Sequence, residues 1–233
     1  MSAPSLGIDA EVFGSDIIPA IEKSFGIQFE QNDFEEVSTY GDLCSTVRSK
    51  LNLASVSTCT TQQAFYKLRL ALQAHGVPAT IGPTSLLEDA LPAQWFQRRR
   101  AVNAIQQVLG MELNILKMPE AVESFFAIMV LLSVVGIPVA GLIIGSRGAT
   151  ICALGFVAAI MGLMIGSWLG NTIRYTTIGE IVSAMSSQYY RQSRRDPSSV
   201  NQTEINHHLS ELFSYHSGIE VRELTSDALL AYK

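Results

Sequence analysis

The stretch from Ser124 to Gly170 reads SFFAIMVLLSVVGIPVAGLIIGSRGATICALGFVAAIMGLMIGSWLG. Its first run, up to Gly145, has no ionisable side chain, and the second run repeats this apolar composition after the turn Ser146-Arg147-Gly148. At ~1.5 Å of rise per residue, each run forms a helix of about 33 Å, enough to cross a hydrocarbon core of roughly 30 Å. Inside lipid, a helix satisfies its own backbone donors and acceptors. The stretch therefore predicts a transmembrane helical hairpin over residues 121–171.

Basic residues indicate how the hairpin is oriented. The turn holds only Arg147, whereas the flanking chain carries Arg98, Arg99, Arg100, Lys117, Arg174, Arg191, Arg194 and Arg195. Because basic residues concentrate on the cytoplasmic side, both termini are expected in the cytoplasm. Met1 to Val12 has neither the basic start nor the apolar core of a signal peptide, so the first span is expected to direct insertion. The predicted location is the inner membrane, with membrane lipid as one partner.

Small residues recur at every fourth position along parts of both predicted spans. These residues are Gly141, Gly145, Ala158, Gly162, Gly166 and Gly170. Such stripes let helix backbones approach closely in lipid, either within the hairpin or between subunits of a homo-oligomer. An oligomeric pore is less favoured, because neither span carries the polar face that a water-filled channel needs.

The composition narrows the classes of partner and cofactor. The 233-residue chain has a net charge of −5 and no dense basic stripe, which argues against nucleic acid as a main partner. Cys44, Cys59 and Cys152 show no paired spacing and fit a reducing compartment. The histidines are interpreted as surface or helix-packing residues away from acidic or thiol residues at ligand spacing, so no metal site is expected.

Amphipathic helices are expected on both sides of the hairpin. Their predicted ranges are 12–24, 39–51, 61–75, 93–109, 177–190 and 203–217. Thr39-Tyr-Gly-Asp42 and Thr177-Ile-Gly-Glu180 both place an acid three residues after a hydroxyl cap, as a capping box does. Arg191 to Gln202 is expected to be a polar linker. No segment alternates like a strand, and the predicted fold class is therefore all-α.

Two pairs of stretches share one pattern of residues. Gly76-Val77 through Thr84-Ser85-Leu86-Leu87-Glu88-Asp89 parallels Gly218-Ile219 through Thr225-Ser226-Asp227-Ala228-Leu229. Phe25-Gly26-Ile27 through Thr39-Tyr-Gly-Asp-Leu43 parallels Leu109-Gly110-Met111 through Thr177-Ile-Gly-Glu-Ile181. The chain is therefore expected to contain a disguised internal repeat.

This pattern resembles the acyl carrier protein family, whose members are small four-helix bundles. The resemblance implies one bundle from residues 58–120 and 172–192, with the membrane hairpin in place of the short third helix. It implies a second, circularly permuted bundle, in which residues 1–57 are completed by residues 200–233. Either fragment alone would leave an apolar face in water, at a cost of roughly 25 cal/mol per Å².

The chemistry of that family depends on a serine that carries a phosphopantetheine arm. The matching positions here are Ala10, after Leu6-Gly7-Ile8-Asp9, and a position near Trp95. Neither side chain offers a hydroxyl, so no cofactor is expected. The chain is more similar to uncharacterised bacterial carrier-like proteins that lack the serine, some of which carry membrane segments.

An aromatic and basic patch lies at the start of the predicted helix 93–109. Its residues are Trp95, Phe96, Arg98, Arg99 and Arg100. Aromatic and Arg side chains are common at binding hot spots, but they also anchor proteins at membrane interfaces. The anchor is the favoured interpretation.

The sequence shows neither nucleophile and base arrangements nor zinc spacings nor a phosphate loop, so it is not expected to be an enzyme. The predicted function is that of a non-catalytic, membrane-anchored, carrier-like scaffold that holds an unidentified protein partner at the cytoplasmic face of the inner membrane. The alternatives are an immunity-type protein that neutralises a dedicated toxin, and a true acyl carrier localised to the membrane.

Overall fold

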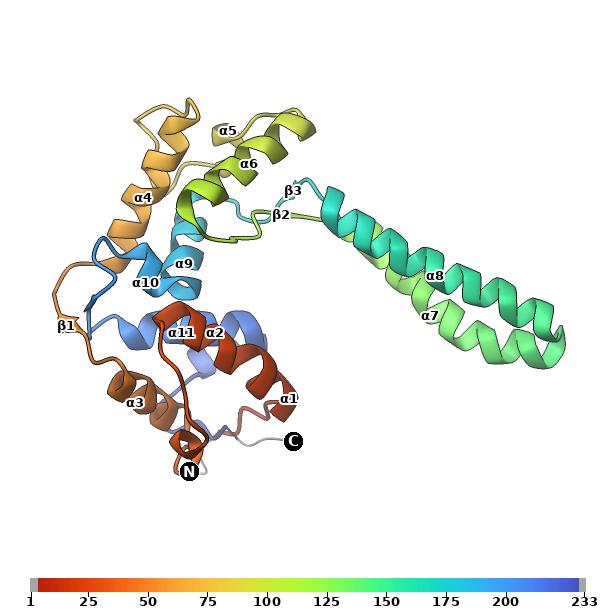
Figure 1. Ribbon diagram of the computed structural model, residues 1–233, viewed down its shortest axis with the longest axis horizontal. Helices are drawn as coiled ribbons and strands as arrows, with labels where there is room; N and C mark the ends of the chain where they lie inside the picture. Colours follow the sequence, from red (N-terminus) through yellow and green to blue (C-terminus); the bar gives the residue numbers. More distant parts are fainter. Residues whose placement is uncertain (1–3, 231–233) are drawn as a thin grey trace. The chain divides into compact units, whose positions relative to one another are not determined.

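The computed structural model describes residues 4–230 and is mainly helical, with two long apolar helices, as the sequence predicts. The chain divides into two units (Figure 1). The helical unit comprises the described residues up to Ser85, Ile105–Leu113 and the described residues from Thr177 onward. The hairpin unit comprises Leu86–Ala104 and Asn114–Thr176. These limits do not coincide with the predicted domain segments, whose identity as carrier-like bundles stays a prediction.

The helical unit contains elements from both ends of the chain. Its first helix is continuous but changes winding, and its other complete helices come from two separate stretches. The elements are α1 (Ala10–Val12), the π-helical turn η1 (Phe13–Ile17), α2 (Ile18–Phe25), the 3-10 turn η2 (Gln31–Phe34), α3 (Tyr40–Lys50), α4 (Thr60–Ala74), α9 (Ile178–Gln188), α10 (Tyr190–Ser193), α11 (Ile205–Ser217) and the 3-10 turn η3 (Val221–Glu223).

The core of the helical unit joins the two ends of the chain. α11 packs against η1, α2 and α3. Ile17, Ile21 and Leu43 are fully buried in the same hydrophobic cluster as the apolar face of α11. The rings of Tyr40 and Phe213 meet edge to face, with centroids 5.3 Å apart. Helices near the N-terminus therefore bury their apolar faces against α11.

A segment after α11 closes over the start of α3 by backbone hydrogen bonds. Tyr40 N–H donates to the Ala228 carbonyl at 2.9 Å, and Gly41 N–H donates to the Ser226 carbonyl at 3.0 Å. A Cβ on Gly41 would lie 2.5 Å from the Ser226 oxygen, so only glycine allows this approach. Leu230 N–H donates to the Ser38 carbonyl at 2.9 Å.

A segment after α4 forms backbone hydrogen bonds with the start of α9 in the same pattern as at the start of α3. Gly179 N–H donates to the Pro83 carbonyl at 2.7 Å, and Ile178 N–H donates to the Ser85 carbonyl at 3.0 Å. Leu87 N–H donates to the Thr176 carbonyl at 2.9 Å. The two capping motifs that share a sequence pattern thus share three backbone hydrogen bonds.

The C-terminal ends of α2 and α6 (Trp95–Leu109) also share one local geometry. Each is followed by a left-handed glycine, Gly26 at φ +61° and Gly110 at φ +67°. Phe29 N–H donates to the Glu22 side chain at 2.7 Å, and Leu113 N–H donates to the Gln106 side chain at 2.8 Å. Gly26 and Gly110, which the sequence pairs in its repeat, therefore occupy matching local structures. The other pairing is shifted by two residues, because the hydrogen bonds make Pro83, and not Ser85, the counterpart of Ser226.

Four two-residue strands occur within residues 4–230, which agrees with the prediction of a mainly α-helical chain. β1 (Ala54–Ser55) pairs in parallel with β4 (Ser199–Val200), and β2 (Leu116–Lys117) pairs antiparallel with β3 (Thr172–Ile173). Two residues are too few to produce the alternation that identifies a strand in a sequence.

The hairpin unit consists of α5 (Leu87–Ala90), α6 up to Ala104, β2, α7 (Glu120–Ile143), α8 (Ser146–Leu169) and β3. α7 and α8 are 24 residues each, long and apolar enough to cross a membrane. Their large apolar side chains are mostly exposed, with Leu142 exposed to 88%. Figure 1 shows them as two antiparallel helices joined by a tight turn, with β2 and β3 leading in and out.

Candidate functional site

Three of the predicted small residues mediate close packing inside the hairpin. A Cβ on Gly162 would collide with the Phe126 ring, and one on Gly166 would collide with the Met118 sulfur. At Gly170 it would lie 2.6 Å from backbone atoms of residues 117 and 118. The contacts of these glycines therefore lie between α8 and the chain at or before α7.

The other three predicted stripe residues have different surroundings. A Cβ on Gly141 would lie 3.6 Å from the Ala149 Cβ across the turn, an ordinary contact. Gly145 lies in the turn itself with φ +79°, where glycine is favoured. Ala158 is exposed, and its neighbour Ala159 is the fully buried alanine. Residues spaced four apart shift gradually around a helix of 3.6 residues per turn. The buried position is therefore Ala159 and not Ala158.

Arginines of α6 hold the end of the second long helix. Arg99 Nη1 donates to the Gly170 carbonyl at 3.2 Å, and its guanidinium lies over the Trp168 ring, 5.5 Å from the centroid. Arg98 donates to the Asn171 carbonyl at 3.4 Å and to the Pro92 carbonyl at 2.9 Å. The Gly170 and Asn171 carbonyls lie just past Leu169, the last residue of α8, where a cation also complements the helix dipole.

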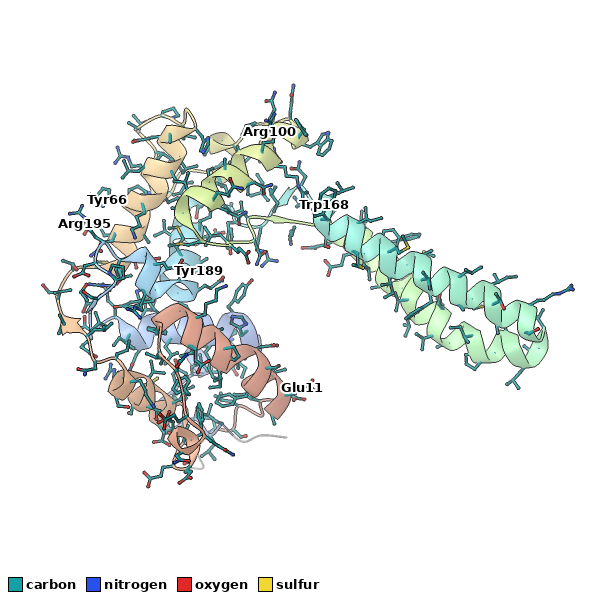
Figure 2. The ribbon with its side chains drawn as sticks, viewed as in Figure 1. Glu11, Tyr66, Arg100, Trp168, Tyr189 and Arg195 are labelled. Atoms are coloured by element: carbon teal, nitrogen blue, oxygen red, sulfur yellow. The ribbon has the colours of Figure 1, made fainter. Side chains whose placement is uncertain are left out.

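Aromatic side chains surround these arginines and remain largely exposed. Trp95 and Phe96 are 57% and 54% exposed, and Trp168 is 71% exposed. Arg100 lies over the Phe96 ring, 5.4 Å from its centroid. Figure 2 labels Arg100 on α6 and Trp168 at the β3 end of α8. Together these six residues, Trp95, Phe96, Arg98, Arg99, Arg100 and Trp168, form what we call the collar of the hairpin.

The collar has the composition of a membrane-interface belt. Indole rings favour the headgroup level, and arginine stems extend along apolar surface while the charge stays in water. The sequence predicts five of its six residues. Trp168 was missed, although its place at the end of an apolar run was a signal for an interfacial aromatic residue.

Ala10 and Trp95, which mark the two positions where the resemblance predicts the carrier serine, both begin a helix. Ala10 is the first residue of α1 and is exposed, and Trp95 is the first residue of α6. Asp9 caps α1, because its carboxylate accepts the Glu11 N–H at 2.7 Å. Neither Ala10 nor Trp95 has a hydroxyl that could carry a phosphopantetheine arm.

A polar cluster lies on α11 in the helical unit. His208 is fully buried, with Nδ1 3.6 Å from Glu211 Oε2 and Nε2 3.9 Å from Glu204 Oε2. His207 Nε2 lies 3.6 Å from Glu211 Oε1. The interpretation that the histidines lack acidic neighbours at ligand spacing is therefore wrong. The signal was the spacing of three and four residues, which brings side chains together on a helix.

Groups from other elements position the two carboxylates of this cluster. Ser183 Oγ of α9 donates to Glu211 Oε1 at 2.6 Å, and the Thr60 N–H at the start of α4 donates to Glu204 Oε2 at 2.9 Å. Burial disfavours the Glu211 carboxylate, but His208, Ser183 and the charge of His207 outweigh burial and hold its pKa below the usual value. Glu211 is thus an anion at neutral pH.

A cavity of about 560 Å³ adjoins the cluster on the exposed side of α11. Its lining includes Tyr40, Cys44, Arg48, Asn206, His207 and Ser210. Burial raises the pKa of both the Tyr40 phenol and the Cys44 thiol above their ordinary values. Both groups are therefore neutral at physiological pH, and Cys44 lacks the thiolate that a nucleophile needs.

Comparison with models of known protein families finds no match, and neither curated proteins nor solved structures match the chain.

Proposed function

We propose that the protein is a non-catalytic, membrane-anchored, carrier-like scaffold that holds a protein partner at the cytoplasmic face of the inner membrane. α7 and α8 span the bilayer in this proposal, and both chain termini lie in the cytoplasm. The observation that carries the proposal is the hairpin with its collar. Two exposed apolar helices end beside arginines that bind the carbonyls of residues 170 and 171.

The helical unit supports the scaffold part of the proposal. Its repeated hydrogen-bond registers agree with two carrier-like bundles, one closed by the segment before Leu230 and the other by Pro83 to Leu87. Carrier bundles act by presenting a helix surface to partner proteins, and at the two serine positions this chain has Ala10 and Trp95. A bundle without the arm retains the capacity to bind a partner and has no group to transfer.

The immunity-type protein remains the second candidate, since it is also a small helical binder without catalytic residues. A true acyl carrier is the third candidate. It requires the arm to be attached to a hydroxyl elsewhere in the chain, because Ala10 and Trp95 have none. All three candidate functions share the membrane anchor. They differ in the partner that the protein binds and in whether a covalent arm adds to the mass of the chain.

Excision of the hairpin tests the anchor. Replacing residues 118–170 by a short Gly-Ser linker is expected to move the protein from the membrane fraction to the soluble fraction, because the exposed apolar helices are removed. The helical unit keeps its core residues in this variant. Fractionation followed by circular dichroism measures both effects.

The full chain and the hairpin-excised variant also test whether the protein acts as a scaffold. Chemical cross-linking in the native host is expected to capture one partner at fixed stoichiometry with both versions, but at the membrane only with the full chain. An excised variant that stays in the membrane contradicts the anchor. A covalent arm in the intact mass favours the true carrier, and a toxin as the captured partner favours the immunity-type protein.

A further inference from the structure

The polar cluster on α11 brings three metal-ligand side chains together. One ligand atom each from His207, His208 and Glu211 lies within 4.8 Å of the others. Their alignment follows from helical spacing, since Glu211 is four residues after His207 and three after His208. Two imidazoles and one carboxylate are a donor set typical of zinc and of neighbouring divalent transition metals.

A second observation indicates that this cluster is incomplete by itself. Among residues 4–230, His208 Nδ1, His208 Nε2 and Glu211 Oε2 are buried and have no hydrogen-bond partner. Buried polar atoms without partners are rare in folded proteins, and a bound ion is one of the recognised explanations. At 3.6 Å, the His208 and Glu211 atoms are too far apart for a hydrogen bond but well placed to share a cation.

We infer that His207, His208 and Glu211 form a binding site for a divalent transition-metal cation, with zinc the best match to these ligands. Zinc bonds of about 2.0–2.2 Å place neighbouring tetrahedral ligands about 3.3–3.6 Å apart. His207 Nε2 lies 3.6 Å from Glu211 Oε1 and His208 Nδ1 lies 3.6 Å from Glu211 Oε2, so each imidazole is near this spacing from one oxygen of the carboxylate. Side-chain rotations would bring the three ligand atoms, which lie within 4.8 Å of one another, onto one cation.

The surroundings supply the outer contacts that metal ligands need. A metal-bound imidazole commonly points its other nitrogen at a carboxylate. Here His208 Nδ1 faces Glu211, and Nε2 faces the Glu204 carboxylate, 3.9 Å away, which the Thr60 N–H holds in place. Ser183 orients Glu211 from the other side. Glu204 and Ser183 are therefore positioning residues in this inference.

Solvent reaches the site beside His207. His208 is fully buried, whereas the His207 side chain is 64% exposed and lines the 560 Å³ cavity. Three protein ligands leave the fourth tetrahedral position to water or to a further ligand. A cation would thus enter beside His207, and its open position would face that cavity. The inference is independent of the proposed scaffold function.

Metal titration of the full-length protein in mild detergent tests this site. After treatment with a chelator and buffer exchange, the wild-type protein is expected to bind one Zn²⁺ by calorimetry. It is expected to bind one Co²⁺ with the visible absorption of a tetrahedral complex. His207→Gln and Glu211→Gln each remove one ligand and are expected to weaken binding at least tenfold.

His75→Gln is the matched control, because His75 is exposed at the end of α4 and outside the cluster. Its affinity for Zn²⁺ is expected to equal that of the wild type. His207 is largely exposed, so His207→Gln is expected to keep the fold, which circular dichroism verifies. Absence of one-to-one binding overturns the inference, as does an affinity unchanged in both His207→Gln and Glu211→Gln.

Discussion

Truncation of the chain after Asn201 is expected to abolish folding of the helical unit. The deletion removes α11 and the closing segment, and with them seven core residues of the cluster that contains Ile17, Ile21 and Leu43. The core residues lost are Ile205, Leu209, Leu212, Phe213, Leu224, Ala228 and Leu230. Burial of each large apolar side chain contributes about 1.5–3 kcal/mol. The sum of roughly 10 kcal/mol or more is comparable to the whole stability of a typical domain.

Size-exclusion chromatography in mild detergent measures this outcome as aggregation, with loss of helix signal by circular dichroism. The hairpin-excised chain is the control for a large deletion, since it loses more residues but retains the core of the helical unit. A truncated chain that stays monodisperse and fully helical would show that the N-terminal helices need no C-terminal completion.

Arg194→Ala is expected to lower the free energy of unfolding of the helical unit by about 1–3 kcal/mol, because removal of one partner leaves buried hydrogen-bonding groups unsatisfied. Arg194 is fully buried. Its guanidinium donates to Thr58 Oγ1 at 3.0 Å and to Ser199 Oγ at 3.2 Å. Thr60 and Tyr190 oxygens accept further bonds from it. Alanine would leave a cavity and remove the donor from these buried acceptors.

Arg195→Ala provides a control at the adjacent residue. Arg195 is exposed, as Figure 2 shows, and its backbone N–H donates to Gln63 Oε1, a hydrogen bond that alanine retains. A change within about 0.5 kcal/mol is expected there. Urea unfolding in mild detergent, followed by circular dichroism, compares the two variants. Equal stability of both variants would contradict a structural role for the buried guanidinium.

The hairpin and the helix caps could be predicted because their signals are local. Two long charge-free runs indicate membrane helices without knowledge of the rest of the chain. Thr39 and Thr177 each accept the N–H of the acidic residue three positions on, as the capping pattern predicts. The last helix begins at Ile205 in the structure and two residues earlier in the prediction, an ordinary uncertainty for a helix end.

The burial of Arg194 could not be read from the sequence. Arg191 to Gln202 looks like a polar linker, yet Ser193, Arg194 and Val200 are fully buried. Thr58, which accepts hydrogen bonds from Arg194, lies 136 residues away in the chain. β1 and β4 pair in the same region by contacts of equally long range. Local periodicity carries no information about such partners.

Part of the polar cluster on α11 could be predicted from the sequence. Glu204, His207 and Glu211 recur at intervals of three and four residues, which was sufficient to place them on one side of a helix. The sequence could not show that His208 is buried, because the elements that cover α11 come from distant parts of the chain. Ser183 and Thr60, which hold the two carboxylates, are 28 and 144 residues away from them.

The most direct test of the account is the accessibility of two cysteines from opposite sides of the membrane. Ser146→Cys marks the turn of the hairpin, and native Cys59, which is exposed, marks the helical unit. Each is made the single reactive cysteine by replacing the others with serine. In intact spheroplasts, a membrane-impermeant maleimide is expected to label Ser146→Cys, and to label Cys59 only after permeabilisation. Labelling of both cysteines, or of neither, in intact spheroplasts would contradict a hairpin that crosses the membrane.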